Sequence, residues 1–277
     1  SDISPGVIFN NTPVTGITSN DITITLNKYE SYVIGANIDE LNNQGNDTLL
    51  NGMLVTSDKP IVVNSGTILG GSDRPSLEGR DAGVDQIVSV DRVGVEYILV
   101  KGIGARPEET EKVLVIADSN STDVFINGNT IPYATLQAGE FSIIPHTEYD
   151  GNNIMYVSTS KKVFVYHTTN SHLTDVYGVG LNFIPPINCG GTKEVTIPEI
   201  DFLGAAAIDL ISNVGATISI NGGAIALPIP IPVTGNPDWE VFRINAITGT
   251  IHVVSDKTMN LSVSTVDGNK GAAGYFS

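Results

Sequence analysis

Four histidines are the first residues to weigh for catalysis: His146, His167, His172 and His252. His167, His172 and Asp175 lie on one short segment, and such groups bind a metal or move a proton when they converge. His167 and His252 also fall inside strand-like patterns, where a histidine is more often packed or solvent-facing. No Gly-x-Ser-x-Gly elbow or phosphate-binding loop accompanies them. The sequence therefore predicts no catalytic residue.

A calcium site is better supported by the sequence than a histidine-based metal site. Asp39, Glu40 and Asp47 lie on a loop that also contains Asn, Gln and a turn-making glycine, and carboxylate and amide oxygens are the ligands that Ca²⁺ prefers. The spacing is not that of an EF-hand, because the third position is Leu41. The alternative is an Asx-rich surface loop in which these side chains bond their own backbone. We predict Asp39, Glu40 and Asp47 as candidate calcium ligands beside that commoner alternative.

Aromatic residues in loops are candidates for ligand binding, because sugar rings stack on aromatic faces. Trp239 is the single tryptophan and follows Asp238 at a junction of loop and strand. Tyr149 and Tyr177 occupy comparable positions. The alternative is that an aromatic at the start of a strand packs into the core. We predict Trp239, Asp238, Tyr149 and Tyr177 as candidate ligand-binding residues.

Arg80 and Asp81 end a loop over residues 70–81 that is rich in paired charges. One interpretation is an Arg–carboxylate pair that fixes the angle between two units of the chain. The other is ligand contact, so Arg80 and Asp81 join the candidate binding residues.

The strands and turns that must position these residues are indicated by a sequence repeat. A short phrase with a central lysine recurs about every hundred residues, at Lys59, Lys161 and Lys257. Its Ser, Thr and Asp side chains are typical of turns, and a lysine at a turn keeps its charge in water. We expect a tight turn between two strands, hence a structural frame. The loops that differ between the copies are then where binding is expected.

Two further landmarks precede each lysine. One is a turn followed by a glutamate, as in residues 26–30 and 136–140. The other is a turn centred on an asparagine, at Asn10, Asn127 and Asn221. Asn-Gly between apolar runs is the strongest short-range signal of a β-hairpin. Both landmarks indicate strands joined by tight turns.

Composition and pattern together predict an all-β fold. Hydrophobic residues make up 41% of the 277 residues and glycine is abundant at 29, while helical periodicity is not sustained anywhere. We expect tandem β-sandwich-like repeats, with a closed barrel or a propeller-like arrangement as the alternative. The predicted units are 1–75 (incomplete), 76–172, and 173–277 with a closing C-terminal strand. Residues 271–276 are also a candidate for completing the first unit.

Charge and cysteine content limit the classes of partner. The net charge of −16 opposes approach to phosphate backbones and anionic lipids. We therefore expect no nucleic-acid partner, and no apolar run is long enough to predict membrane insertion. The single cysteine, Cys189, excludes an intrachain disulfide. Such a protein can still be extracellular if a large core stabilises it.

The chain resembles the N-terminal domain of IgGFc-binding protein, a family also found in large bacterial surface proteins. The segments that support this resemblance are 52–63, 80–87, 94–100, 127–128, 136–140 and 274–277. The resemblance implies a secreted or cell-surface protein with a role in adhesion or glycoprotein binding. The mammalian members have cysteine-rich neighbours, so a single cysteine points to a bacterial relative. Binding of the antibody Fc region is not carried over.

Three functions follow as hypotheses. The first is a non-enzymatic adhesion module of a large secreted protein, binding a glycan or glycoprotein on a cell or matrix surface and contacting neighbouring domains of the same long chain. The second is a structural spacer of a surface filament without a ligand. The third is a carbohydrate-active enzyme on a β scaffold, which no sequence motif supports. The first is our prediction.

Overall fold

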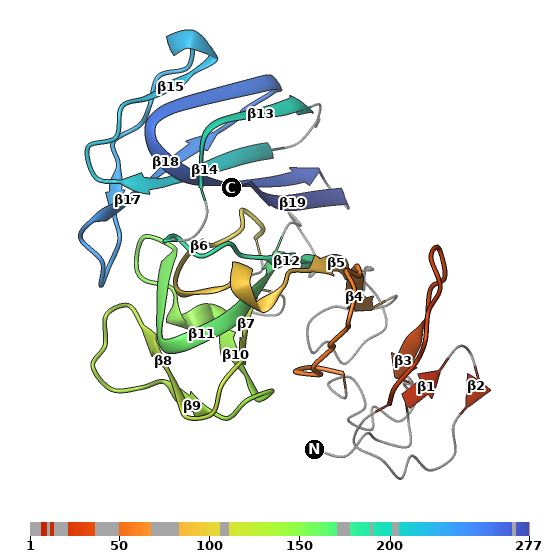
Figure 1. The fold of residues 1–277 in the computed structure, drawn as a ribbon. Coiled ribbons are helices and arrows are strands. Elements are labelled where there is room, and N and C mark those ends of the chain that lie inside the picture. Colours follow the sequence, from red (N-terminus) through yellow and green to blue (C-terminus); the bar gives the residue numbers. More distant parts are fainter. Residues whose placement is uncertain are drawn as a thin grey trace. The chain divides into compact units, whose positions relative to one another are not determined.

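The computed structural model describes residues 7–9, 12–13, 22–36, 50–67, 83–105, 111–170, 178–188, 191–200, 205–267 and 270–276. They belong to two compact units, unit 1 (Ser1–Val55) and unit 2 (Thr56–Ser277). Strands are the main regular elements in the described ranges, and the helices there are single 3₁₀ turns (Figure 1). The predicted all-β class is confirmed.

Unit 1 contains a small antiparallel sheet in the order β2-β1-β3, formed by Val7–Phe9 (β1), Thr12–Pro13 (β2) and Ile34–Ala36 (β3). The predicted glutamate turn precedes β3. The Glu30 backbone N–H donates to the Asn27 carbonyl at 3.1 Å, and the Asn27 N–H donates to the Glu30 carboxylate at 2.8 Å. These two bonds close the turn from both ends.

Unit 2 begins with a two-stranded sheet and continues with two seven-stranded ones. The first pairs Val63–Thr67 (β4) with Gly83–Ile87 (β5). The middle sheet consists of Gly94–Val100 (β6), Lys112–Ala117 (β7), Thr122–Ile126 (β8), Ala134–Leu136 (β9), Phe141–Pro145 (β10), Ile154–Asn170 (β11) and Gly178–Phe183 (β12). Two 3₁₀ turns, Val90–Arg92 (η1) and His146–Glu148 (η2), flank its strands.

The C-terminal sheet consists of Thr192–Ile200 (β13), Ala205–Asn213 (β14), Ile218–Ile220 (β15), Ile231–Pro232 (β16), Trp239–Asn245 (β17), Gly249–Asp267 (β18) and Lys270–Phe276 (β19), with a 3₁₀ turn at Asn221–Gly223 (η3). The C-terminal strand β19 pairs with β18 over its whole length. The tail therefore adds a strand to the C-terminal sheet.

One long strand organises the middle sheet into two layers. The first half of β11 pairs with β6 and β8, and the second half pairs with β7 and β12. Because the strand passes from one layer to the other, the two layers face each other. Their inner side chains form one core that includes Leu99, Val113, Val124 and Val163. This is a sandwich-like arrangement, as predicted.

The C-terminal sheet follows the same plan with β18 as its long strand. The first half of β18 pairs with β13 and β15, and the second half pairs with β14 and β19. A second core, including Ile208, Ile220, Ile251 and Leu261, fills the space between its layers. Unit 2 thus contains two copies of one architecture.

The lysine phrase lies where each long strand changes layer, and here the prediction of a tight turn is wrong for the second and third copies. The pairing of β11 with β6 shifts register between Ser158 and Val163, while the strand itself continues from Ile154 to Asn170. Lys257 lies at the matching point inside β18. A bulge or register shift bends a strand without ending it, so the phrase encodes a bend.

Alternating burial shows why these segments form strands. In β7 (Lys112–Ala117) and β8 (Thr122–Ile126), every second side chain is buried and those between are half-buried. A period of two places one set of side chains on the inner face of a layer. The predicted unit boundaries at 75/76 and 172/173 lie outside the described residues and stay predictions.

Candidate functional site: the seam between the two sandwiches and the grooves beside it

The middle and C-terminal sheets contact each other through a mainly apolar layer, which we call the seam. It consists of Ile98, Val100, Ile154, Tyr156, Ile187, Ile211, Val233, Trp239 and Val241. These side chains come from the outer faces of β6 and β11 and from β14, β17 and nearby loops. The outer face of each sandwich is thus apolar where the other covers it, so the two are packed as one body.

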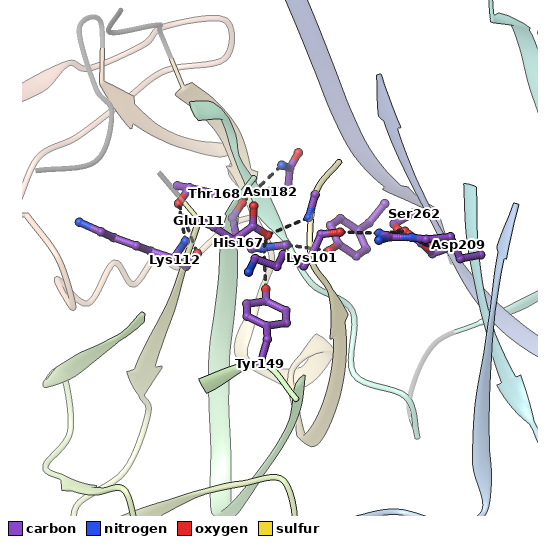
Figure 2. A network of polar contacts seen from close by, with 12 residues as sticks. Lys101, Glu111, Lys112, Tyr149, His167, Thr168, Asn182, Asp209 and Ser262 are labelled. Atoms are coloured by element: carbon purple, nitrogen blue, oxygen red, sulfur yellow. Dashed lines mark hydrogen bonds and ion pairs between the residues drawn. The ribbon is translucent and has the colours of Figure 1, made fainter. Parts of the chain in front are cut away.

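A cluster of buried ionisable groups lies beside the seam (Figure 2). His167 on β11 has its Nε2 atom 2.6 Å from Glu111 Oε1 and 2.8 Å from the Tyr149 hydroxyl. Its Nδ1 atom is 2.7 Å from the hydroxyl of Tyr275, which lies on β19 of the other sheet. The Gly102 N–H donates to Glu111 at 3.0 Å. The imidazole thus joins a carboxylate of one sandwich to a phenol of the other.

A second ion pair continues this network into the C-terminal sheet. Arg243 Nε donates to Asp209 Oδ1 at 2.7 Å, and Nη2 donates to Asp209 Oδ2 at 3.1 Å. Nη2 also donates to the carbonyl oxygen of Lys101 in the middle sheet, and Ser262 donates to Asp209 at 3.2 Å. Bidentate pairs of this kind are the strongest hydrogen-bonded ion pairs in proteins. Arg243 therefore links the two sandwiches through its bond to the Lys101 carbonyl, while Asp209 of its own sheet balances its charge.

Burial governs the protonation of the phenols in this network. Loss of solvation raises the pKa of Tyr149 well above its ordinary value, and the charge of Glu111 adds to the effect. The pKa of Tyr275 is raised well above the ordinary value by the same two causes. Both phenols thus stay neutral, with hydroxyl groups available for hydrogen bonds. Asp209 also raises the pKa of Arg243 against the effect of burial.

The arrangement does not suit catalysis, although a carboxylate–histidine–tyrosine chain can move a proton in other settings. His167 and Glu111 have fully buried side chains, so a substrate cannot reach either one. A general base has to lie within hydrogen-bond reach of the proton that it takes. We interpret this network as the polar part of the contact between the two sandwiches.

Two glycines bring the loops of the sandwiches into close contact at the edge of the seam. A Cβ atom on Gly128 would lie 2.6 Å from the Gly235 Cα, and one on Gly235 would lie 2.3 Å from the Gly128 nitrogen. Next to them, Thr234 donates to Asp150 at 2.6 Å. Only glycine permits this approach, since real Cβ atoms do not come so near backbone.

The predicted ligand-binding residues fall in different places. Trp239 is buried in the seam, and Tyr149 is buried in the polar network. Asp238 is exposed, and its backbone N–H donates to Asn236 Oδ1 at 3.3 Å. The burial of both rings corresponds to the core alternative considered from the sequence, and their ligand role stays a prediction.

The remaining predicted site residues lie outside the described residues: Tyr177, Arg80 and Asp81 of the ligand set, and Asp39, Glu40 and Asp47 of the calcium loop. Within the ranges that the structure describes, no group of three or more His, Cys, Asp or Glu side chains is arranged to hold a metal. The calcium site stays a prediction.

Sequence reasoning missed Glu111, Arg243, Asp209 and Tyr275. A signal for two of them was present, because Asp209 interrupts the apolar run Ala-Ile-Asp-Leu-Ile and Arg243 interrupts Val-Phe-Arg-Ile. A charge inside a strand of buried residues needs a partner. Complementary charges on two such strands predict a buried pair.

The repeated landmarks have matching structural roles in the two sandwiches. Lys161 Nζ donates to the Asn120 carbonyl at 2.5 Å, and Lys257 Nζ donates to the Val214 carbonyl at 2.8 Å. In each case the acceptor lies in the loop that follows the strand paired with the long one, β7 or β14. The lysine therefore fixes the same loop in both copies.

The turn asparagines correspond in the same way. Asn127 Oδ1 accepts from the Tyr156 N–H at 3.0 Å, and Asn221 Oδ1 accepts from the His252 N–H at 2.7 Å. Both asparagines have positive φ, at 52° and 48°. Asparagine tolerates this backbone conformation better than most residues. The repeated residues thus make the same structural contacts in both sandwiches, while the connecting loops differ.

Two hollows open on the surface of unit 2. One, of about 330 Å³, lies beside the β8–β9 connection and is lined by Ile126, Asn129, Thr130, Ile131, Tyr133 and Glu148. The other, of about 310 Å³, lies where β5, β12 and β19 meet and is lined by Asp85, Gln86, Val88, Asn182, Phe183, Gly274 and Tyr275. Both are lined by a mixture of apolar and polar side chains.

Among the described residues, no helix has the length and apolar character required to cross a membrane. No curated protein matches the chain at a significant level. Residues 2–265 match the family described as IgGFc binding protein. This range covers the N-terminal unit and nearly all of the two sandwiches, so the resemblance noted from separate segments extends over the chain. The chain is a member of the IgGFc binding protein family.

Proposed function

We propose that the chain is a non-enzymatic, extracellular interaction module that binds a glycoprotein-type partner. The match of residues 2–265 to the IgGFc binding protein family is the observation that carries this proposal. The sealed His167–Glu111 pair supports a non-catalytic role. The seam also supports it, because a binding surface that is held rigid loses little entropy when the partner binds.

Charge supports a choice of partner surface. The net charge of −16 opposes partners that are themselves strongly acidic. Neutral or basic regions of a glycoprotein therefore fit better than sulfated or sialylated ones. We place the contact in the loops between the strands, because the repeated lysines and asparagines make hydrogen bonds that stabilise the fold.

A binding assay with paired ligands tests the proposal. The 277-residue chain is immobilised, and a panel of secreted glycoproteins, including the antibody Fc region, is passed over it with and without enzymatic removal of the glycans. Saturable binding of at least one glycoprotein with a Kd of about 100 μM or tighter is expected for a transient contact. Absence of binding across the panel, with a folded protein, contradicts the proposal.

A spacer of a surface filament is the second candidate, and the seam favours it. Apolar packing, the His167–Tyr275 hydrogen bond and the bond from Arg243 to the Lys101 carbonyl link the two sandwiches, and they would let the unit bear force as one body. Single-molecule pulling is the measurement. Unfolding of both sandwiches in one event supports a load-bearing role, whereas separation of the sandwiches at low force argues against it.

Calcium at Asp39, Glu40 and Asp47 is a proposal that a melting experiment tests. If the loop binds Ca²⁺, the midpoint of thermal unfolding of unit 1 rises with calcium and falls with chelator, because a ligand that binds the folded state stabilises it. Magnesium at the same concentration is the control for ionic strength. An unchanged midpoint removes calcium from the proposed function.

A further inference from the structure

The hollow beside the β8–β9 connection, which we call the groove, lies in a part of the repeat that differs between the two sandwiches. After Asn127 the middle sheet continues through residues 128–133 into β9, and the groove is built on this stretch. After the corresponding Asn221, the C-terminal sheet passes through η3 and a different loop to β16. The two loops therefore take different paths on one frame, and the first lines a hollow that includes Tyr133.

The walls of the groove combine an aromatic ring, an aliphatic side chain and polar groups. The Tyr133 side chain is 42% exposed and Ile131 is 78% exposed. Asn129 and Thr130 come from the same connection, and Glu148 comes from η2. The groove thus offers a ring face, a carboxylate, an amide and a hydroxyl within about 330 Å³. That volume lies in the range of small-molecule sites.

Tyr133 and Glu148 line the same groove. Loss of solvation and the negative charge of Glu148 together raise the pKa of Tyr133. The phenol is accordingly neutral at physiological pH, and the carboxylate is an acceptor beside it. A hydroxyl-bearing ligand can donate to that carboxylate while its apolar face covers the ring.

Backbone and side-chain contacts hold both walls in place. Asn127 Nδ2 donates to the Glu148 carbonyl at 2.8 Å, and the Asn129 N–H donates to the Ile126 carbonyl at 3.0 Å. The Tyr133 N–H donates to the Val124 carbonyl at 2.7 Å. The groove therefore has its shape before a ligand binds, which reduces the entropic cost of binding.

We propose that this groove is a subsite for a neutral pyranose, with the sugar ring on Tyr133 and its hydroxyls bonded to Glu148 and Asn129. This inference rests on the proposed function, since the sugar would belong to the glycoprotein partner. A neutral sugar is the choice because Glu148 would repel an anionic one in a chain of net charge −16. A peptide would need a longer groove with backbone partners, and the experiment below separates it from a sugar.

The experiment uses neutral hexoses and N-acetylhexosamines displayed in many copies on an inert carrier, because multivalent display makes a weak single contact measurable. Sialic acid on the same carrier is the anionic comparison. The 277-residue chain and four variants are tested: Tyr133→Ala, Tyr133→Phe, Glu148→Gln and Tyr29→Ala. Tyr29 is an exposed tyrosine in unit 1, so Tyr29→Ala is the matched control for removal of a surface ring.

We expect one or more neutral sugars to bind and the sialic acid carrier to bind at least about tenfold more weakly, as like-charge contact predicts. Tyr133→Ala and Glu148→Gln should each weaken binding by about tenfold, the effect of losing one well-placed contact. Tyr133→Phe keeps the ring and should stay within about threefold of the unmodified chain. Tyr29→Ala should bind normally. The urea midpoint of each variant shows that the fold is intact.

Three outcomes overturn the inference. Failure of every neutral sugar to bind is the first, and equal binding by Tyr133→Ala and the unmodified chain is the second. The third is capture of a glycoprotein that persists after its glycans are removed, which indicates a peptide contact. That third result leaves the proposed function standing, whereas failure to capture any glycoprotein contradicts the proposed function itself.

Discussion

At the scale of single residues, the structure contains two histidine–glutamate pairs, one buried and one exposed. His167 and Glu111 are 2.6 Å apart with both side chains fully buried. His252 and Glu194 are 2.9 Å apart with side chains 42% and 70% exposed. Exposed pairs contribute little because water screens them, whereas loss of one member of a buried pair leaves the other without compensation. The two pairs therefore allow a matched test.

We predict that His167→Ala lowers the free energy of unfolding by about 3 kcal/mol, because Glu111 would keep its burial and lose its closest partner. His252→Ala should change it by less than about 0.5 kcal/mol. Urea unfolding followed by circular dichroism measures both. Equal effects of the two substitutions would show that burial does not decide the strength of these pairs.

Buried phenols make stability depend on alkaline pH. Burial, followed by Glu96, raises the pKa of Tyr156 to about 12, and burial and the charge of Glu111 also raise the pKa values of Tyr149 and Tyr275 well above the ordinary value. Above pH 10 the unfolded chain loses phenolic protons that the folded chain retains. Stability due to these groups is therefore complete below about pH 10 and is lost as the pH rises toward 12.

We therefore predict that the urea midpoint falls between pH 10 and about 12 and that Tyr156→Phe makes this fall shallower, because one raised group is removed. The measurement is a series of urea unfolding curves between pH 8 and pH 12. A parallel fall in the variant and the unmodified chain would mean that Tyr156 does not contribute. Comparison at pH 8 separates this effect from the loss of the hydrogen bond to Glu96.

At the scale of elements, the repeated lysine has one role in two places. Lys161 and Lys257 each donate to a carbonyl in the loop beside the bend of a long strand. Since both lysines are exposed or half-exposed, we predict that Lys161→Ala costs only about 0.5–1 kcal/mol. The local effect should be larger: faster amide exchange in the loop around Asn120. Lys162→Ala, its exposed neighbour, should leave that exchange unchanged.

The strands of the middle sheet were largely predictable. The sequence pattern predicted strands joined by tight turns around Asn127 and residues 136–140, and the structure has Thr122–Ile126 before the Asn127 turn and Phe141–Pro145 after residues 136–140. Alternating burial is a local property, so the sequence records it directly. The bend at the lysine phrase was misinterpreted because a turn and a bulge use the same small polar residues. Only long-range pairing with β6 and β7 separates the two.

The seam could not be predicted in the same way. The sequence allowed Trp239 and Tyr149 to be either ligand-binding aromatics or core residues, because burial depends on which face of which sheet covers them. That is a tertiary property without a local signal. The charges of Asp209 and Arg243 inside apolar runs were the available clue, and they indicate burial without indicating the partner.

At the scale of the whole molecule, unit 2 depends on how closely its two sandwiches approach. Gly235 and Gly215 both have positive φ, at 86° and 73°. A Cβ atom on Gly235 would meet the Gly128 backbone, whereas one on Gly215 would meet nothing within 4 Å. Alanine at either position would lower the free energy of unfolding by roughly 1–2 kcal/mol, because a residue with a Cβ atom is disfavoured in the left-handed conformation. Only alanine at Gly235 also forces the sandwiches apart.

We predict that Gly215→Ala lowers stability by roughly 1–2 kcal/mol and leaves one cooperative unfolding transition. Gly235→Ala should lower it further and split the transition into two, because the seam would open while each sandwich keeps its own core. Calorimetry, together with tryptophan fluorescence of Trp239 in the seam, follows both events. A single transition in Gly235→Ala, shifted no more than in Gly215→Ala, would mean that the glycine contact does not hold the two sandwiches together.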